Sequence, residues 1–267
     1  MSVAVVTGGA RGIGKAIATA LAESGFRVVI ADIDENAAIE ASAGISGTGL
    51  QLDVTDGAAF RALVAHVEEK IGEIHVLVNN AGIMPIGPLL EFSDDSIDRA
   101  LAINLRGVIN GTRAVLPGMV ARRRGHIFNV ASIAGRVAVP GGSIYSASKY
   151  GVVGFTDGVR EEFYPQGIRV TAVLPSFTKT ELIAGTDVPK GTKASEPEDI
   201  AAAVMAALGK DEAHVYVPKS LKAHYVANTL LPVKVGRAIA RAAGADRVFL
   251  DFDKSGRAAY DKRIAES

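Results

Sequence analysis

The chain has 267 residues, of which 48% are hydrophobic and 22% are charged. This composition is that of a globular protein with enough apolar side chains to bury a core. The formal net charge is +0 and there is no cysteine. The neutral charge excludes a global electrostatic field that would recruit nucleic acid. The lack of cysteine excludes disulfides, thiol redox chemistry and cysteine-ligated metal. No apolar run approaches the roughly 18 residues that span a bilayer and no secretion pattern is visible, so we expect a cytoplasmic protein that binds no nucleic acid.

Short apolar segments alternate along the chain with longer segments of helical periodicity. We predict strands at residues 3–7, 28–31, 49–52, 74–78, 126–130, 169–174 and 214–217. These segments are apolar nearly throughout, as in strands that are covered on both faces. The alternation predicts an α/β fold, with a doubly wound parallel sheet of about seven strands and helices on both faces. The ligand crevice should lie at the carboxyl ends of the strands.

The segment after the last predicted strand differs from the rest of the chain. Because no linker rich in proline, glycine or serine precedes it, we predict one domain, residues 1–218, with a helical extension, residues 219–267, packed on or beside it. Between residues 219 and 241 the extension has no acid and carries Lys219, Lys222, Lys234, Arg237 and Arg241. Pro232 should divide this segment into two helices. Its cationic and apolar composition leaves peripheral membrane contact open.

A glycine-rich turn follows the first predicted strand and opens the first helix. Gly8, Gly12 and Gly14 let the backbone turn sharply and approach a diphosphate closely. The helix start beyond them supplies unpaired N–H groups and the positive end of a dipole. Arg11 and Ile13 lie within the same turn and belong to the predicted cofactor site. A plain strand–helix connection is the alternative role for this turn.

A second nucleotide-binding motif overlaps the turn. Gly9, Gly14 and Lys15 match the phosphate loop of phosphoryl-transfer enzymes. Ala16 stands where that loop needs the hydroxyl that holds Mg²⁺. Phosphoryl transfer is therefore disfavoured.

Acidic residues follow the second and third predicted strands. Asp32 comes 18 residues after Gly14, where a carboxylate can accept both hydroxyls of a ribose and repel a 2′-phosphate. A helix N-cap is the alternative role, although Asp34 is equally well placed for it. Asp53 and Val54 close the third strand, where a side chain and a backbone N–H can meet an adenine.

Acid–base chemistry is indicated by three residues that follow the fifth predicted strand: Ser132, Tyr145 and Lys149. Tyr145 and Lys149 are four apart in a helical segment, so they lie on one helix face. A tyrosine with a pKa near 10 is a poor acid–base group at neutral pH, and a fixed ammonium beside it favours the phenolate. Ser132 follows the strand, where its hydroxyl can donate to a substrate oxygen as charge develops. Singly, each residue is typical of a solvated helix face or a turn, whereas together with the glycine-rich turn they form a set.

That set resembles the short-chain dehydrogenase/reductase family over residues 3–217. The resemblance is carried by the TGGARGIG turn, Asp53-Val54, Asn79-Asn80-Ala81-Gly82, Asn104, Ser132, the YSASK segment of residues 145–149, and Pro175. It implies a Rossmann-type fold, an NAD(P)(H) cofactor and a Ser–Tyr–Lys catalytic group with an added asparagine. It further implies that Tyr145 is the general acid/base, that Lys149 binds the nicotinamide ribose and lowers the tyrosine pKa, and that Ser132 orients the substrate carbonyl. Asn104 would support a water that links to Lys149.

The resemblance also implies cofactor contacts on two further loops. Asn80, Ala81 and Gly82 would line the adenine-ribose side, and Thr180 would reach the carboxamide. The loop after the sixth strand contributes Pro175, Phe177 and Thr178 to the predicted cofactor site. Ser176 stands where the family usually has a glycine, and a serine is less permissive of positive φ, so this loop can follow a different path.

The choice between NAD and NADP depends on two side chains of opposite charge. Arg11 is a feature often linked to NADP in this family, whereas Asp32 opposes a 2′-phosphate. Repulsion between a carboxylate and a phosphate should outweigh the attraction of one flexible arginine, so we expect NAD. We expect no bound metal.

The expected activity is NAD(H)-dependent interconversion of a secondary alcohol and a ketone. Apolar residues around the predicted crevice favour a lipid- or steroid-like substrate: Ile83, Met84, Val137, Val139, Leu182 and Ile183. A non-catalytic dinucleotide sensor and an NADPH-dependent carbonyl or oxoacyl reductase are the alternatives. A serine acyl-enzyme is discounted because only its S-x-x-K motif is present.

Two further expectations rest on the family resemblance. In relatives with hydrophobic substrates such extensions cover the substrate mouth, although an inert surface segment or an oligomer contact is an equal alternative here. The resemblance also implies association through the helices near residues 99–115 and 149–164. Because the extension can block the family's second interface near the seventh strand, we expect a homodimer rather than a tetramer.

Overall fold

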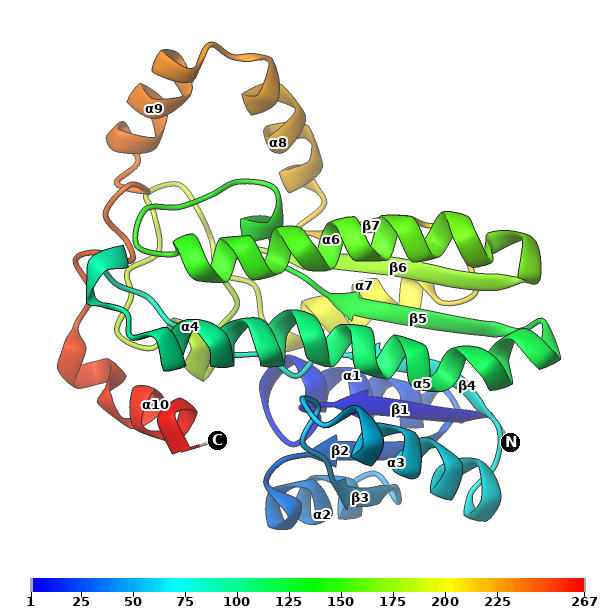
Figure 1. The fold of residues 1–267 in the computed structure, drawn as a ribbon. Coiled ribbons are helices and arrows are strands. Elements are labelled where there is room, and N and C mark those ends of the chain that lie inside the picture. The colour runs from blue at the N-terminus through cyan, green and yellow to red at the C-terminus, as the bar shows by residue number, and fades with distance from the viewer. Residues whose placement is uncertain (1, 267) are drawn as a thin grey trace.

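The computed structural model describes residues 2–266, so Met1 and Ser267, at the outer ends of the two predicted ranges, lie outside the described residues. Within this range seven parallel strands form one sheet in the order β3-β2-β1-β4-β5-β6-β7 (Figure 1). The strands are β1 Val3–Thr7, β2 Arg27–Asp32, β3 Thr48–Gln51, β4 Ile74–Asn79, β5 Gly125–Val130, β6 Ile168–Pro175 and β7 His214–Val217. The predicted doubly wound parallel sheet is confirmed.

Helices cover both faces of the sheet (Figure 1). On one face lie α1 Gly12–Glu23, α2 Glu35–Ala43 and α7 Pro197–Ala207; on the other lie α3 Gly57–Lys70, α5 Gly107–Arg122 and α6 Ser143–Phe163. The shorter α4 Asp94–Leu101 leads into α5 through a π-helical segment, Ala102–Arg106. The first face buries Ile17, Leu21 and Val204 against the sheet, and the second buries Phe60 and Met119. This burial on both sides explains why the strands are apolar without alternation.

The order of the strands places the binding crevice. From β1 the chain moves outward to β2 and β3, and from β4 it moves outward in the opposite direction to β7. The loops that leave β1 and β4 therefore diverge, which opens a crevice at the carboxyl ends of these two strands.

A buried polar network joins β4 and β5 to the helices above them. Asn79 Nδ2 donates to Asn129 Oδ1 over 2.9 Å and to Thr112 Oγ1 over 3.3 Å. Asn129 Nδ2 in turn donates to Thr156 Oγ1 over 2.9 Å. Thr112 belongs to α5 and Thr156 to α6, so the network holds both helices in register with the central strands. Asn129 also lies three residues before Ser132 and thus helps to place the end of β5.

The described part of the C-terminal extension, up to residue 266, forms three helices. As predicted, Pro232 separates two of them, α8 Ser220–Leu230 and α9 Val233–Ala242. Together they make an arch that projects from the body of the protein (Figure 1). A third helix, α10 Lys254–Glu266, returns to the carboxyl edge of the sheet. Among the described residues, none of the helices is long and apolar enough to cross a bilayer.

Truncation of Asn129 tests the polar network. We expect Asn129→Ala to lower the free energy of unfolding by about 2 kcal/mol, because it leaves the buried Asn79 amide without its shorter hydrogen bond. Gln51→Ala is the control: its amide is exposed, and its loss should change stability by less than about 0.5 kcal/mol. Urea denaturation of both variants measures the difference, and equal midpoints would contradict the structural role of the network.

Candidate active site

A cavity of about 940 Å³ opens outside the carboxyl ends of the strands. It brings together most residues that the sequence predicted for the cofactor and for catalysis. Its lining includes Gly8, Arg11, Gly12, Ile13, Asp32, Asp53, Val54, Asn80, Ala81, Gly82, Ser132, Tyr145, Lys149, Pro175, Phe177, Thr178 and Thr180. Two predicted residues, Gly14 and Asn104, do not line it, and each acts on the cavity through a neighbour.

The glycine-rich turn leads into a helix whose N-terminus is uncapped and lies beside the cavity. Helix α1 has no side-chain hydrogen bond at its N-cap, Arg11, and no acidic residue in its first turn. Gly12 has a φ of 51°, which an L side chain rarely adopts. A Cβ on Gly14 would lie 2.2 Å from the carbonyl oxygen of Gly8, so only glycine allows the turn to close on the helix. N–H groups without an internal partner at this position fit the diphosphate of a dinucleotide.

Asn80 stabilises the same turn from the neighbouring strand end. Its Nδ2 donates to the carbonyl oxygens of Thr7, at 3.1 Å, and of Gly8, at 2.9 Å. Its backbone N–H donates to Thr7 Oγ1 over 3.0 Å. Asn80 therefore links the loops that leave β1 and β4 and sets the width of the crevice between them.

The end of β2 carries two carboxylates rather than one. Asp32 Oδ2 accepts from the backbone N–H of Ala10 over 3.2 Å, and Oδ1 accepts from that of Asp34 over 3.3 Å. Asp34 caps α2 and also accepts from Arg11 Nη2 over 2.7 Å. This hydrogen bond from Arg11 holds the pKa of Asp34 below its usual value. Asp34 lines the cavity as well. Its N-cap role was expected, but its contact with Arg11 joins two separate loops and left no sign in the sequence.

Three of the four predicted catalytic residues, Ser132, Tyr145 and Lys149, meet at the end of β5. Tyr145 and Lys149 lie on the inner face of α6, and both side chains are buried. Lys149 Nζ donates to the carbonyl oxygen of Val130 over 2.8 Å and lies 5.7 Å from the centre of the Tyr145 ring. Ser132 Oγ accepts from the backbone N–H of Ala134 over 3.0 Å. The hydroxyl of Ser132 thus stands at the start of the turn that follows β5, facing the tyrosine.

Burial dominates the protonation of this group. It raises the pKa of Tyr145 to about 12, although the neighbouring Ser132 hydroxyl acts in the opposite direction. Burial also lowers the pKa of Lys149 to about 8. In the chain without cofactor, burial therefore outweighs any lowering of the Tyr145 pKa by Lys149, and that role of Lys149 stays a prediction. The physical reason is that the ammonium is directed at Val130, and neither charge is well solvated.

Asn104 positions the loop after β4. It is fully buried in the π-helical segment; its Oδ1 accepts from the N–H of Ile83, and its Nδ2 donates to the carbonyl oxygen of Ile83, both over 2.8 Å. Nδ2 also contacts Ser148 Oγ at 3.0 Å. A Cβ on Gly82 would lie 3.2 Å from Asn104 Oδ1 and 3.5 Å from Lys149 Nζ. The missing side chain at Gly82 leaves the space between the amide and the ammonium open.

The last helix closes one side of the cavity, and no local sequence pattern announced it. Arg257 is completely buried, and its guanidinium donates to the carbonyl oxygens of Leu182, Ala184 and Met84. Tyr260 Oη accepts from the N–H of Met84 over 2.8 Å. These bonds fasten α10 to the loops that follow β4 and β6. The extension consequently adds cavity-lining residues that the sequence did not indicate: Phe249, Tyr260, Arg263 and Ile264.

The apolar part of the lining largely matches the expectation. Ile83, Met84, Val139, Leu182 and Ile183 all line the cavity. Val137 does not line it; its N–H donates to the carbonyl oxygen of Ile133 in the turn after β5. Among the described residues, no cluster of acidic and histidine side chains could hold a metal ion.

Comparison with known proteins agrees with this geometry. Residues 2–188 match the family described as short chain dehydrogenase. The 3-oxoacyl-(acyl-carrier-protein) reductase FabG of Vibrio harveyi is 35% identical over 225 residues, which cover 80% of this chain and 92% of that protein. Glycine betaine reductase ATRR of Emericella nidulans is 36% identical over 224 residues, 79% of this chain but only 18% of that longer protein.

A solved structure is similar over nearly the whole domain. It is a short chain dehydrogenase/reductase from Burkholderia phymatum in complex with NAD. The TM-score is 0.77 at 27% identity, and the match covers 85% of this chain and 92% of that chain. The fold is therefore shared with a protein whose structure was determined in complex with NAD.

The buried lysine should cost stability at neutral pH. In the folded chain the pKa of Lys149 is about 8 against an ordinary 10.5. Below pH 8 the folded chain therefore carries a buried charge that lowers its stability. At pH 7 we expect Lys149→Met to raise the free energy of unfolding by up to about 3 kcal/mol. The variant should therefore unfold at a higher denaturant concentration than the parent. The difference should shrink between pH 8 and 10.5, where the folded lysine loses its proton before the unfolded one.

The exposed Lys210 provides the matched control, since Lys210→Met should change neither the stability nor its pH dependence. Denaturation curves at pH 7 and pH 10 measure both effects. A Lys149→Met variant whose advantage stays the same at the two pH values would contradict the depressed pKa.

Proposed function

The chain belongs to the short-chain dehydrogenase/reductase family, and on that premise we propose that it uses NAD(H) to interconvert a secondary alcohol and a ketone. The observation that carries the proposal is that one cavity contains both the Tyr145 hydroxyl and the uncapped start of α1. Such an arrangement holds a dinucleotide with its reactive end beside a proton donor. When bound, the nicotinamide supplies or accepts the hydride at the substrate carbon.

The residues of this chain would provide the proton and the orientation. In reduction, the Tyr145 hydroxyl donates its proton to the substrate oxygen as the carbon gains hydride. Ser132 donates a hydrogen bond to the same oxygen, where negative charge develops. In oxidation the Tyr145 phenolate takes the hydroxyl proton back. Lys149 lies near enough to stabilise that phenolate, and we propose that it also contacts the nicotinamide ribose.

We propose NAD as the preferred cofactor because of the charge around Asp32. Asp32 and Asp34 place two carboxylates where the adenosine ribose would lie, and Arg11 already pairs with Asp34. Asp34 thus offsets the charge of Arg11, and a 2′-phosphate would still meet an excess of negative charge. The diphosphate would contact the N–H groups of Gly12 and Ile13 at the helix start.

The likeness to FabG supports a second candidate, an NADPH-dependent carbonyl or oxoacyl reductase. The two candidates differ in cofactor and in substrate. The apolar lining of the cavity, from Met84, Leu182 and Phe249, favours a lipid- or steroid-like ketone in either case. A non-catalytic sensor is less well supported, because Tyr145 and Lys149 both reach the cavity.

We further propose a homodimer through the outer surfaces of α5 and α6. Gly154 and Gly158 leave open space on the exposed side of α6, and Tyr150 is exposed beside them. Small residues allow a second copy to approach closely. Helix α8 lies against β7, so it covers part of the other sheet edge.

Replacement of the tyrosine hydroxyl tests the mechanism. We expect Tyr145→Phe to lower kcat for a ketone by about 100- to 10,000-fold, because only the acid/base proton is lost. NADH affinity, measured by nicotinamide fluorescence, should stay nearly the same. In the parent, oxidation should accelerate as the pH rises, because a tyrosine with a raised pKa supplies little phenolate at neutral pH. Near-full activity of the variant would refute the assignment.

Removal of the carboxylate at the end of β2 tests the cofactor preference. We expect Asp32→Ser to raise the ratio of kcat/KM with NADPH to that with NADH by about 10- to 100-fold, since a unit charge near the 2′-phosphate is removed. Glu23→Gln is the control, because Glu23 is exposed at the carboxyl end of α1 and does not line the cavity. A parent that favours NADPH would support the second candidate instead.

A further inference from the structure

The arch, residues 218–245, has a charge that differs from that of the rest of the chain. The whole sequence is neutral, yet residues 213–245 contain no aspartate or glutamate. The cations on the arch are Lys219, Lys222, Lys234, Arg237 and Arg241. Arg241 lies 3.8 Å from Asp246, at the foot of the arch. The projecting part of the arch is therefore uniformly positive.

Helix α9 separates its cations from its apolar residues. Lys234, Arg237 and Arg241 follow i, i+3, i+7 spacing and lie on one side of the helix. Val235 and Ile239, with the small residues between their turns, lie on the opposite side. Within the described part of the chain the apolar side is only partly covered, since Val235 is 43% exposed and Ile239 is 48% exposed. An amphipathic helix whose apolar side remains largely in water is only weakly stabilised by the protein that carries it.

The tip of the arch is more apolar still. Leu230, Leu231 and Val233 flank Pro232 at the turn between the two helices, and Leu230 is 80% exposed. Figure 1 shows this turn as the part of the arch farthest from the sheet. Val226, one turn earlier on α8, is also exposed. A large apolar surface of this kind on a projecting segment indicates a docking surface.

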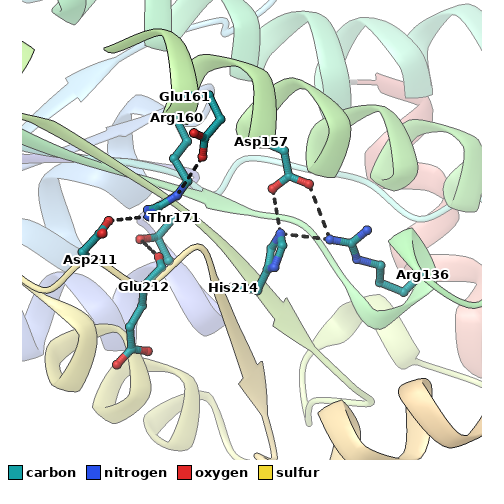
Figure 2. Close-up of polar contacts among 8 residues, drawn as sticks. All are labelled: Arg136, Asp157, Arg160, Glu161, Thr171, Asp211, Glu212 and His214. Atoms are coloured by element: carbon teal, nitrogen blue, oxygen red, sulfur yellow. Dashed lines mark hydrogen bonds and ion pairs between the residues drawn. The ribbon is translucent and has the colours of Figure 1, made fainter. Parts of the chain in front are cut away.

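Both feet of the arch are fastened to the body. Arg136, after β5, places its guanidinium 5.8 Å from the centre of the Tyr225 ring on α8. Figure 2 shows how Asp157 of α6 and His214 of β7 hold that guanidinium: Nη2 lies 3.5 Å from Asp157 Oδ2 and 2.9 Å from His214 Nε2. At the other foot, the N–H of Lys190 donates to the carbonyl oxygen of Ala243 over 3.1 Å. Contacts with the body at both ends of the arch therefore hold the tip in its projecting position.

We propose that the arch docks the protein on an anionic lipid surface. Exposed aliphatic side chains beside lysine and arginine suit the boundary between acyl chains and negatively charged headgroups. A second copy of the chain is a poorer occupant, because a symmetric contact would place these cations against their own counterparts. Nucleic acid would satisfy the cations but leave the tip, around Leu230, in water. The proposal does not depend on which substrate or cofactor the cavity takes.

A tryptophan probe tests insertion of the apolar side. The chain has no tryptophan, so Ile239→Trp introduces a single reporter on α9. We expect its fluorescence to shift to the blue when phosphatidylcholine vesicles containing phosphatidylglycerol are added. Tyr164→Trp is the matched control, because Tyr164 is 54% exposed on the turn after α6, away from the arch, and its emission should not move. Equal shifts from both reporters, or none from either, would overturn the proposal.

Charge reversal tests the electrostatic part. We expect the full-length parent to sediment with anionic vesicles, less so with pure phosphatidylcholine, and progressively less as salt is raised. The triple variant Lys222→Glu, Lys234→Glu, Arg237→Glu should lose this binding. The control variant Arg61→Glu, Lys70→Glu, Lys210→Glu alters three other exposed cations and reaches the same net charge, but it should still bind.

Two further measurements keep the outcome clear. NADH binding and thermal unfolding should be the same in both triple variants, which shows that any loss of sedimentation is not a loss of fold. Light scattering of the parent without lipid measures its mass. If charge reversal on the arch changes that mass, or if both triple variants sediment equally, the arch contacts a protein or nothing, and the lipid proposal is wrong.

Discussion

A hydrogen bond from Lys149 Nζ to the carbonyl oxygen of Val130 joins α6 to the carboxyl end of β5. It holds the ammonium against the end of β5 and orients the face of α6 that carries Tyr145. Ser132 lies two residues beyond the acceptor, so the same bond sets the distance between the hydroxyl groups that would meet the substrate. The rest of the site is arranged around a charged group that the protein holds away from water.

That arrangement works against the stability of the chain without ligand. A buried ammonium and a buried phenol both resist the charge changes that catalysis would require, and their pKa values move apart in the unhelpful direction. A bound dinucleotide would change the balance, because it brings further charge and excludes water from the same space. Functional sites commonly carry such conflicts, and here the site lies directly beside the buried polar network around Asn129.

Much of the fold could be predicted because its causes are local. Strands buried on both faces read as unbroken apolar runs, and the Tyr145–Lys149 spacing places two side chains on one helix face whatever the tertiary context. The glycine-rich turn was equally legible, since a Cβ at Gly14 would collide with the backbone. Arg257 was not, because its partners are backbone carbonyls as far as 173 residues away, and a carbonyl leaves no mark in a sequence. The orientation of Lys149 could not be predicted for a similar reason: spacing reports that an ammonium is near Tyr145, but not that it is turned toward Val130.

The attachment of α10 has a consequence for how such a protein can diversify. Arg257 and Tyr260 bind backbone groups of Met84, Leu182 and Ala184 rather than their side chains. The attachment of α10 therefore does not depend on which side chains stand at those three positions. Residues that shape the cavity can be exchanged on either side of the junction while the closure itself persists. Evolution, or an engineer, can thus retune what the cavity admits without dismantling the wall that defines it.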